Sequence, residues 1–178
     1  ASTRNGGMLG SGHKVSVADA KKYYGSDIAA QLHCEANGSL DFTKSLIIDH
    51  KINCDLQASG RLRTAWTPQD YSAMAQANRS LQKIEPFAAR MIKPNAMTEH
   101  INTPLYFGGL LYEGHACVQP RKFHYGLLKL ALDAGVKVFG DQPAHSVKPR
   151  GSGFCITTKN QFIDCEQVLM ATNGYTQS

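Results

Sequence analysis

The sequence predicts an α+β fold in which packed helices cover a mixed or antiparallel sheet. Three observations support this prediction. Apolar residues recur every three to four positions in several long segments, which is the helical period. Apolar and polar residues alternate in shorter segments between them, as in half-buried strands. The G-x-G-x-x-G turn between a strand and a helix that marks a complete Rossmann unit is absent.

Composition bounds the class of protein. The 178 residues suffice for a buried core, and the 42% apolar content is typical of globular proteins. The net charge of +5 comes from 19 basic and 14 acidic side chains scattered along the chain, which favours an anionic small ligand over a nucleic acid. No apolar window approaches the roughly 18 residues of a membrane span, and no basic-then-apolar leader is present. We therefore expect a cytoplasmic protein with no membrane span.

Cysteine and histidine spacings match no common metal or redox motif. The five cysteines are an odd number and none forms C-x-x-C, which favours reduced thiols. The seven histidines are dispersed without H-E-x-x-H or H-x-H spacing, so we expect no metal site. The oligomeric state stays open.

The first ten residues form a small, amide-rich segment. Its three glycines allow a ligand to approach the backbone closely, and successive backbone N–H groups can form an anion-binding nest there. Arg4 adds a guanidinium that can fork onto phosphate or carboxylate oxygens. The alternative interpretation is a flexible end.

Two helices are predicted next. Residues 15–24 form a short helix that Gly25 ends, and Ser26 caps a second helix with Asp27 near its positive end. The apolar stripe of this second helix comprises Ile28, Leu32, Ala36, Leu40, Thr43, Leu46, Ile47 and His50. Asn37-Gly38 interrupts the stripe, which leaves open one long helix or two short ones.

Strand and helix signals then alternate. Residues 54–64 predict a half-buried strand or a hairpin that turns near Ser59-Gly60. The Thr-Pro-Gln-Asp sequence of residues 67–70 is typical of a helix start, and Glu85-Pro86 ends this helix. The following stretch gives no clear signal beyond one or two helical turns at 95–100.

A crossover unit of the α/β type is predicted in the second half. Residues 105–112 form a strand bent at its glycines, and 116–119 a returning strand. Pro120 begins a helix that Gly135 closes, and residues 136–139 form a further strand. Strand, helix, glycine and strand in this order are typical of such a unit.

Short strands and a polar turn complete the chain. The strands, with a hairpin turn at Lys159-Asn160, are residues 144–149, 154–159, 162–164 and 168–171, and the polar turn is 172–176. By character the chain has four regions. These are the glycine-rich segment 1–14, the helical region 15–53, the strands and helices of 54–119, and the crossover helix and strands of 120–178.

Several of these segments together resemble one family. Residues 1–7 are similar to the Ser-Gly-Arg-Asn-Gly-Gly segment of FAD-dependent amine and amino-acid oxidoreductases. These include D-amino-acid oxidase, glycine oxidase and sarcosine oxidase, and the γ-glutamylputrescine oxidoreductases resemble the chain most. Further matches follow in the family's order, at residues 106–110, 119–127, 135–138 and 171–176. Gln119 stands where the family usually has histidine.

The resemblance implies an internal fragment of an α/β parent. Members of the family begin with a strand, a G-x-G-x-x-G turn and a helix whose N-terminus binds pyrophosphate. The G-x-G triplets here, at residues 10–12 and 151–153, neither follow a strand nor open a helix. The family's C-terminal flavin-contacting segment is also missing. We therefore expect most of the substrate domain and part of the FAD-domain strands.

The resemblance further implies which residues face the cofactor, FAD. At the N-terminal end these are Ser2, Arg4, Asn5, Gly6, Gly7 and Met8. Ala144 stands where the family's backbone touches adenine, and Thr172 and Gly174 stand near the adenosine. Candidates for the substrate pocket, all on predicted strands, are Arg61, Arg63, Tyr106 and Tyr112. The alternative for each, which we favour, is a solvated strand face or an aromatic that packs on the sheet. No general base is nominated, because orientation of the substrate matters more than a strong base in this chemistry.

The implied function is oxidation of the carbon–nitrogen bond of a small-molecule amine or amino acid. The flavin accepts a hydride equivalent and the resulting imine hydrolyses. We expect the isolated chain to be inactive and to retain no FAD. The substrate and the choice between oxidase and dehydrogenase stay open. Two alternatives lack redox chemistry, namely a non-catalytic α+β binding module and an adenine-nucleotide-binding domain.

Overall fold

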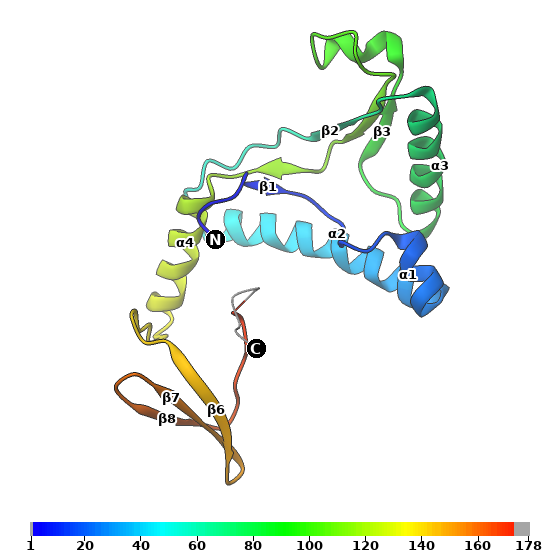
Figure 1. Ribbon diagram of the computed structural model, residues 1–178. Helices are drawn as coiled ribbons and strands as arrows, with labels where there is room; N and C mark the ends of the chain where they lie inside the picture. Colours follow the sequence, from blue (N-terminus) through cyan, green and yellow to red (C-terminus); the bar gives the residue numbers. More distant parts are fainter. Residues whose placement is uncertain (1, 173–178) are drawn as a thin grey trace. The chain divides into compact units, whose positions relative to one another are not determined.

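The computed structural model of the chain describes residues 2–172 (Figure 1). The chain divides into two compact units, Ala1–Ala131 and Leu132–Ser178. The first unit holds helices and two small antiparallel sheets, and the second holds one three-stranded antiparallel sheet. This mixture confirms the predicted α+β class. The division into four regions stays a prediction.

The first two helices follow each other directly at a glycine. α1 (Val17–Tyr24) begins at Ser16, whose side chain accepts the backbone N–H of Asp19. Gly25 has a φ of 87°, which glycine adopts without steric penalty, and it ends α1 as predicted. The same residue is the N-cap of α2 (Ser26–Asp49), so the prediction that Ser26 caps this helix was wrong.

α2 is one continuous helix of 24 residues that passes through Asn37-Gly38. Its buried face comprises Ala29, His33, Ala36, Leu40 and Ile47. This face differs from the predicted stripe at its start, where Ile28 is exposed, and at its end, where His50 is exposed and follows the last helical residue. The reason at the start is that α1 packs on that part of α2, and small residues such as Ala20 and Ala29 allow the two helices to approach closely.

Both ends of the third helix lie where the sequence predicted them. α3 (Pro68–Ile84) begins at Thr67 with a complete capping box and ends at Glu85, as predicted. A 3-10 helix, η1 (Pro94–Glu99), occupies the region where one or two helical turns were expected.

The larger sheet of the first unit has the strand order β2-β4-β3 and is antiparallel throughout. Its strands are β2 (Arg61–Thr64), β3 (Ala89–Ile92) and β4 (Gly109–Tyr112). β2 falls within the predicted strand and alternates exposed arginines with half-buried residues. It pairs with β4 instead of forming a local hairpin.

The predicted strand 105–112 is ordered as a strand only from Gly109 onward. Gly108 has a φ of 92°, and a Cβ atom there would lie 2.6 Å from both the carbonyl oxygen of Ile92 and the ring of Tyr71. The backbone at Gly108 therefore lies very close to Ile92 and Tyr71, and the regular strand pairing ends at this point.

The second sheet joins distant parts of the chain. β1 (Met8–Leu9) pairs antiparallel with β5 (Ala116–Cys117). Figure 1 shows this pair alongside α2. The buried core of this region is formed by Ile47, Ile52, Cys54 and Val118, and Leu9 of β1 packs against it. α4 (Pro120–Asp133) begins at Pro120 as predicted and packs on this core through Phe123 and Leu130.

The second unit is a three-stranded meander. Its strands are β6 (Ala144–Arg150), β7 (Gly153–Thr158) and β8 (Phe162–Cys165), in the order β6-β7-β8. All three were predicted, and the β7–β8 connection contains Lys159-Asn160 as expected.

The predicted strands at 136–139 and 168–171 do not form, so the crossover unit is not completed. Neither segment has a neighbouring strand to pair with among residues 2–172. Both lack regular secondary structure and carry exposed apolar side chains, including Val138, Phe139 and Leu169, of which Leu169 is 91% exposed. The two segments therefore have the apolar sequence of strands but no partner strand among the described residues.

Two further features concern the whole described part. No helix among residues 2–172 is long and apolar enough to cross a membrane. All five cysteines are free thiols.

Candidate functional site

The N-terminal ribbon, residues 2–9, is folded by its own amide side chain. The Asn5 Oδ1 atom accepts the backbone N–H of Gly7 at 2.9 Å, and Asn5 Nδ2 donates to the carbonyl oxygen of Ser2 at 3.1 Å. These two bonds close the turn on both sides. The last two residues of the ribbon form β1, which is paired with β5. The ribbon is thus an ordered part of the first unit.

The two adjacent glycines of this turn have different surroundings. Gly7 is buried with a φ of 66°, and a Cβ atom there would lie 2.0 Å from the carbonyl oxygen of Val118. Gly7 also accepts the backbone N–H of Val118 at 2.8 Å. Gly6 is exposed, and a Cβ atom built on it would meet nothing within 4 Å. Gly7 fixes the ribbon to the fold, while Gly6 presents bare backbone outward.

The outward side of the turn offers donors and positive charge. Within residues 2–172, the backbone N–H groups of Asn5 and Gly6 have no hydrogen-bond acceptor. The exposed Arg4 makes no ion pair with any described residue. Free backbone amides and a guanidinium within three consecutive residues suit an anionic or strongly polar ligand that approaches the backbone.

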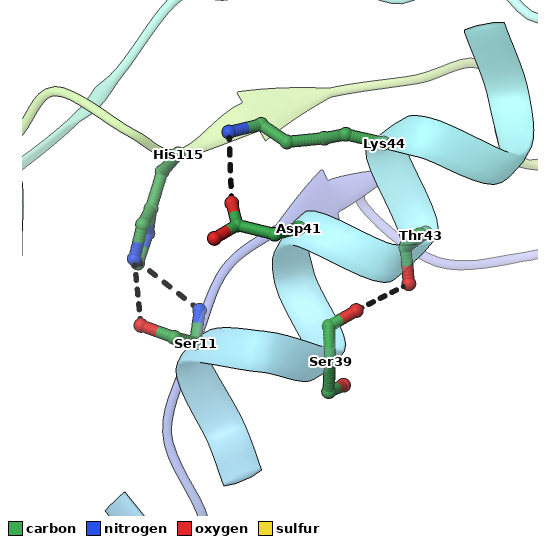
Figure 2. A network of polar contacts seen from close by, with 6 residues as sticks. All are labelled: Ser11, Ser39, Asp41, Thr43, Lys44 and His115. Carbon is green, nitrogen blue, oxygen red and sulfur yellow. Dashed lines mark hydrogen bonds and ion pairs between the residues drawn. The ribbon is translucent and has the colours of Figure 1, made fainter. Parts of the chain in front are cut away.

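A buried histidine holds the chain that follows the ribbon. His115 lies between β4 and β5, and its Nε2 atom is 3.3 Å from both the backbone nitrogen and the Oγ atom of Ser11 (Figure 2). Burial, together with the positive charges of Arg61 and Lys44, lowers the pKa of His115 below its usual value. Sequence reasoning missed this contact, because the two residues are 104 positions apart and no motif links them.

The predicted substrate residues are engaged in aromatic contacts. Tyr112 stacks on His115 with ring centroids 4.7 Å apart, and the guanidinium of Arg61 lies 5.8 Å from the Tyr112 centroid. Tyr106 packs edge-on against Trp66 at 4.9 Å. Arg63 is exposed on β2. A substrate-lining role for these residues stays a prediction.

The remaining predicted cofactor residues lie in the second unit. Ala144 is exposed at the start of β6, and Thr172 is exposed at the end of the described chain. Gly174 lies outside the described residues. The structure therefore gathers residues 2–8 on one ribbon but gives no relation between that ribbon and Ala144 or Thr172.

Other candidate sites offer little. The described residues contain no cluster of three metal-ligating side chains. A shallow hollow of about 410 Å³ lies on the second unit, and its lining, which includes Arg150, Phe154 and Asp164, contains no predicted site residue. Arg150 and Asp164 are ion-paired there at 2.9 Å and both are exposed.

Comparison with protein families and curated proteins gives consistent matches. The model of the family described as DAO, FAD dependent oxidoreductase, matches residues 1–178. The Haemophilus influenzae protein named "Probable oxidoreductase OrdL" is 22% identical over 176 residues, which cover 98% of this chain and 41% of that protein. The chain therefore spans less than half the length of this relative.

Solved structures share the fold. Glycine oxidase from Geobacillus kaustophilus superposes with a TM-score of 0.70 at 16% identity, over 93% of this chain and 43% of the enzyme. L-Amino acid deaminase from Proteus myxofaciens, solved with anthranilate, gives a TM-score of 0.70 at 13% identity, over 92% of this chain and 35% of the enzyme.

Proposed function

Because the chain belongs to the FAD dependent oxidoreductase family, we propose that it is part of a longer flavoenzyme that oxidises the carbon–nitrogen bond of an amine or amino acid. The family uses FAD, which makes this group the cofactor to test against the site. The substrate class is supported by similarity in fold to a glycine oxidase and an L-amino acid deaminase. The proposed longer protein has the length of the relatives, of which this chain spans about 41%.

The N-terminal ribbon fits such a cofactor. FAD is long and carries a pyrophosphate, so it needs a surface of backbone donors free of bulky side chains. The exposed Gly6, the unpaired N–H groups of Asn5 and Gly6, and the guanidinium of Arg4 supply these features within the described residues. We propose that Ser2 and residues 4–8 contact FAD from this side. We propose Ala144, Thr172 and Gly174 as contacts to its adenosine half.

The chemistry divides between cofactor and chain. When bound, FAD supplies an acceptor for the hydride equivalent that leaves the carbon bearing the substrate nitrogen. The chain contributes position: the Asn5 bonds hold the turn closed, and Gly7 anchors it against Val118. Such preorganisation lowers the entropy cost of ordering a ligand. The guanidinium of Arg61 lies over the ring of Tyr112, and this contact orients it. A substrate carboxylate could bind the guanidinium in this orientation.

Gly6 is the single observation that carries the proposal, and it gives a clean test. In the full-length protein, Gly6→Leu places a side chain where this chain has open space, so the fold should tolerate it. If FAD lies against this backbone, the Leu side chain blocks it, and the dissociation constant for FAD should rise at least about tenfold. Flavin fluorescence titration of the apoprotein measures this change.

The matched control is Gly38→Leu. Gly38 is exposed in the middle of α2, a Cβ atom added to it would meet nothing within 4 Å, and it lies on no proposed cofactor surface. The affinity of this variant for FAD should equal that of the wild type. Equal FAD affinity in both variants would contradict a flavin-facing ribbon.

The reaction itself needs a separate assay. The full-length protein should reduce a redox dye or release hydrogen peroxide with amines or amino acids as substrates, and running both assays side by side distinguishes dehydrogenase from oxidase. Tight binding of FAD without turnover of any amine would favour the non-catalytic binding module. Binding of adenine nucleotides without FAD would favour the adenine-nucleotide-binding domain.

A further inference from the structure

His115 joins the N-terminal chain to the sheet from a buried position. The residue is 4% exposed and lies in the connection between β4 and β5. Figure 2 shows its ring directed at Ser11, with both contacts at 3.3 Å. Gly10 lies directly against the ring, since a Cβ atom there would be 2.7 Å from Nδ1. The ring therefore packs on the backbone that immediately follows β1.

The hydrogen bond to the backbone fixes the protonation state of the ring. A backbone N–H can only donate, so the Nε2 atom of His115 accepts from Ser11. A neutral imidazole that accepts at Nε2 carries its proton on Nδ1. Nδ1 is buried and has no partner among the described residues. Protonation would add a hydrogen at Nε2 that faces the Ser11 N–H, so the bond to the backbone would be lost, and only the Ser11 Oγ atom could then accept from the ring.

The charges around the ring also oppose the cation. The positive charges of Arg61 on β2 and Lys44 on α2 lower the pKa of His115. Tyr112 on β4 stacks on the ring. Asp41, which Figure 2 shows on α2 beside Lys44, is ion-paired with Lys44 at 3.8 Å. Glu113, two residues before His115, is ion-paired with Arg90 at 2.8 Å. The carboxylates are thus already balanced by cations of their own, and neither hydrogen-bonds to the imidazole.

We propose that His115 is a positioning residue for the N-terminal ribbon, whose neutral ring tethers Ser11 and whose protonation releases that tether, so that the ribbon loses its fixed position in acid. The weakening of FAD binding that would follow rests on the proposed function, whereas the tether itself does not. The residue touches no proposed cofactor contact directly and acts through Gly10 and Ser11.

The direction of the pH effect follows from the fold. The pKa of His115 is lowered from its ordinary value of 6.5, mainly by burial, so the folded state favours the neutral ring. The unfolded or released ring takes up a proton more readily. The stability due to the tether is therefore fully present above a pH of about 6.5 and is lost as the pH falls from there toward the pKa of the folded state.

Hydrogen–deuterium exchange at the Ser11 amide tests the tether without any cofactor. In the full-length apoprotein, protection of this amide, corrected for the intrinsic exchange rate, should fall at least about tenfold from pH 7.5 to pH 5. His115→Gln keeps an acceptor that does not titrate, and its Ser11 protection should be the same at both pH values. His115→Phe keeps an aromatic ring beside Tyr112 without an acceptor, and Ser11 should be unprotected at both.

His33→Gln is the matched control, because His33 is the other buried histidine whose pKa is lowered by burial. It lies on α2 and makes no bond to Ser11, so the wild-type pH response at Ser11 should persist. Equal Ser11 protection at the two pH values in the wild type would overturn the proposal. So would a wild-type pH response in His115→Gln.

Titration with FAD at the same two pH values separates this inference from the proposed function. Affinity for FAD should fall in acid in the wild type and change less in His115→Gln. If Ser11 protection responds as expected while FAD affinity does not follow it, the tether stands and the flavin-facing role of the ribbon is wrong.

Discussion

Two neighbouring glycines in the N-terminal ribbon show how far a single residue can be understood from its place in the fold. Gly7 has a φ of 66° and no room for a side chain, because the carbonyl oxygen of Val118 and the ring of Pro120 lie against it. Gly6 has neither restriction. The sequence alone does not distinguish them, since both are glycines in a polar, small-residue segment.

We predict that Gly7→Ala destabilises the protein by at least about 2 kcal/mol, through backbone strain at positive φ and through displacement of the chain that follows β5. Gly6→Ala should change the free energy of unfolding by less than about 0.5 kcal/mol. Urea denaturation of the two variants and the wild type measures both values. Similar destabilisation by the two substitutions would mean that the ribbon is not anchored at Gly7.

Among the secondary-structure elements, those with local signals were predicted most fully. The Thr67 Oγ1 atom accepts the backbone N–H of Asp70 at 3.1 Å, and Asp70 Oδ2 accepts the backbone N–H of Thr67 at 3.0 Å. Both partners lie within four residues, so the sequence contains the whole motif. The same is true of Gly25 after α1 and of Pro120 at the start of α4.

We predict that Thr67→Ala lowers the stability of the protein by about 1 kcal/mol, because the backbone N–H of Asp70 at the start of α3 loses its acceptor, the Thr67 Oγ1 atom. Ser72→Ala in the same helix is the control. The Ser72 hydroxyl only donates to the Pro68 carbonyl oxygen on the exposed face, so its removal should change stability by less than about 0.5 kcal/mol. Thermal or urea unfolding followed by circular dichroism compares the variants.

The strands were predicted less well because their formation depends on distant partners. β3 is four residues long, too short to show a period, and it exists as a strand through its pairing with β4. β5 was expected to return along β4, but it pairs with β1, more than 100 residues earlier in the chain. The Ser11–His115 contact depends on this same long-range pairing. No local pattern specifies such partners.

At the scale of the whole molecule, the segments 136–139 and 168–171 of the second unit, which were predicted as strands but have no regular structure, are informative. Val136, Val138 and Phe139 in one segment and Leu169 and Met170 in the other have strand-like sequences, yet all five are more than half exposed. In the family, strands of this kind belong to a sheet that a G-x-G-x-x-G unit helps to build. The sequence of this chain contains no G-x-G-x-x-G turn, and we propose that segments 136–139 and 168–171 form strands only when they pair within the sheet of the longer protein.

The same argument predicts the behaviour of the chain with FAD. The proposed contacts of residues 2–8 and of Ala144, Thr172 and Gly174 cover only parts of the cofactor, and the helix N-terminus that binds pyrophosphate in the family lies outside this chain. We therefore predict that the 178-residue chain, incubated with FAD and desalted, shows no flavin absorption band, while the full-length protein retains one.

Circular dichroism of the chain serves as the control, because the comparison is meaningful only if its helices are formed. A chain that is folded and colourless means that the ribbon and the second unit need the pyrophosphate site to hold FAD. A flavin band that survives desalting would contradict this prediction. It would mean that the exposed backbone at Gly6 and its neighbours binds FAD strongly enough without the missing unit, and the tenfold effect expected for Gly6→Leu could then be measured on the chain itself.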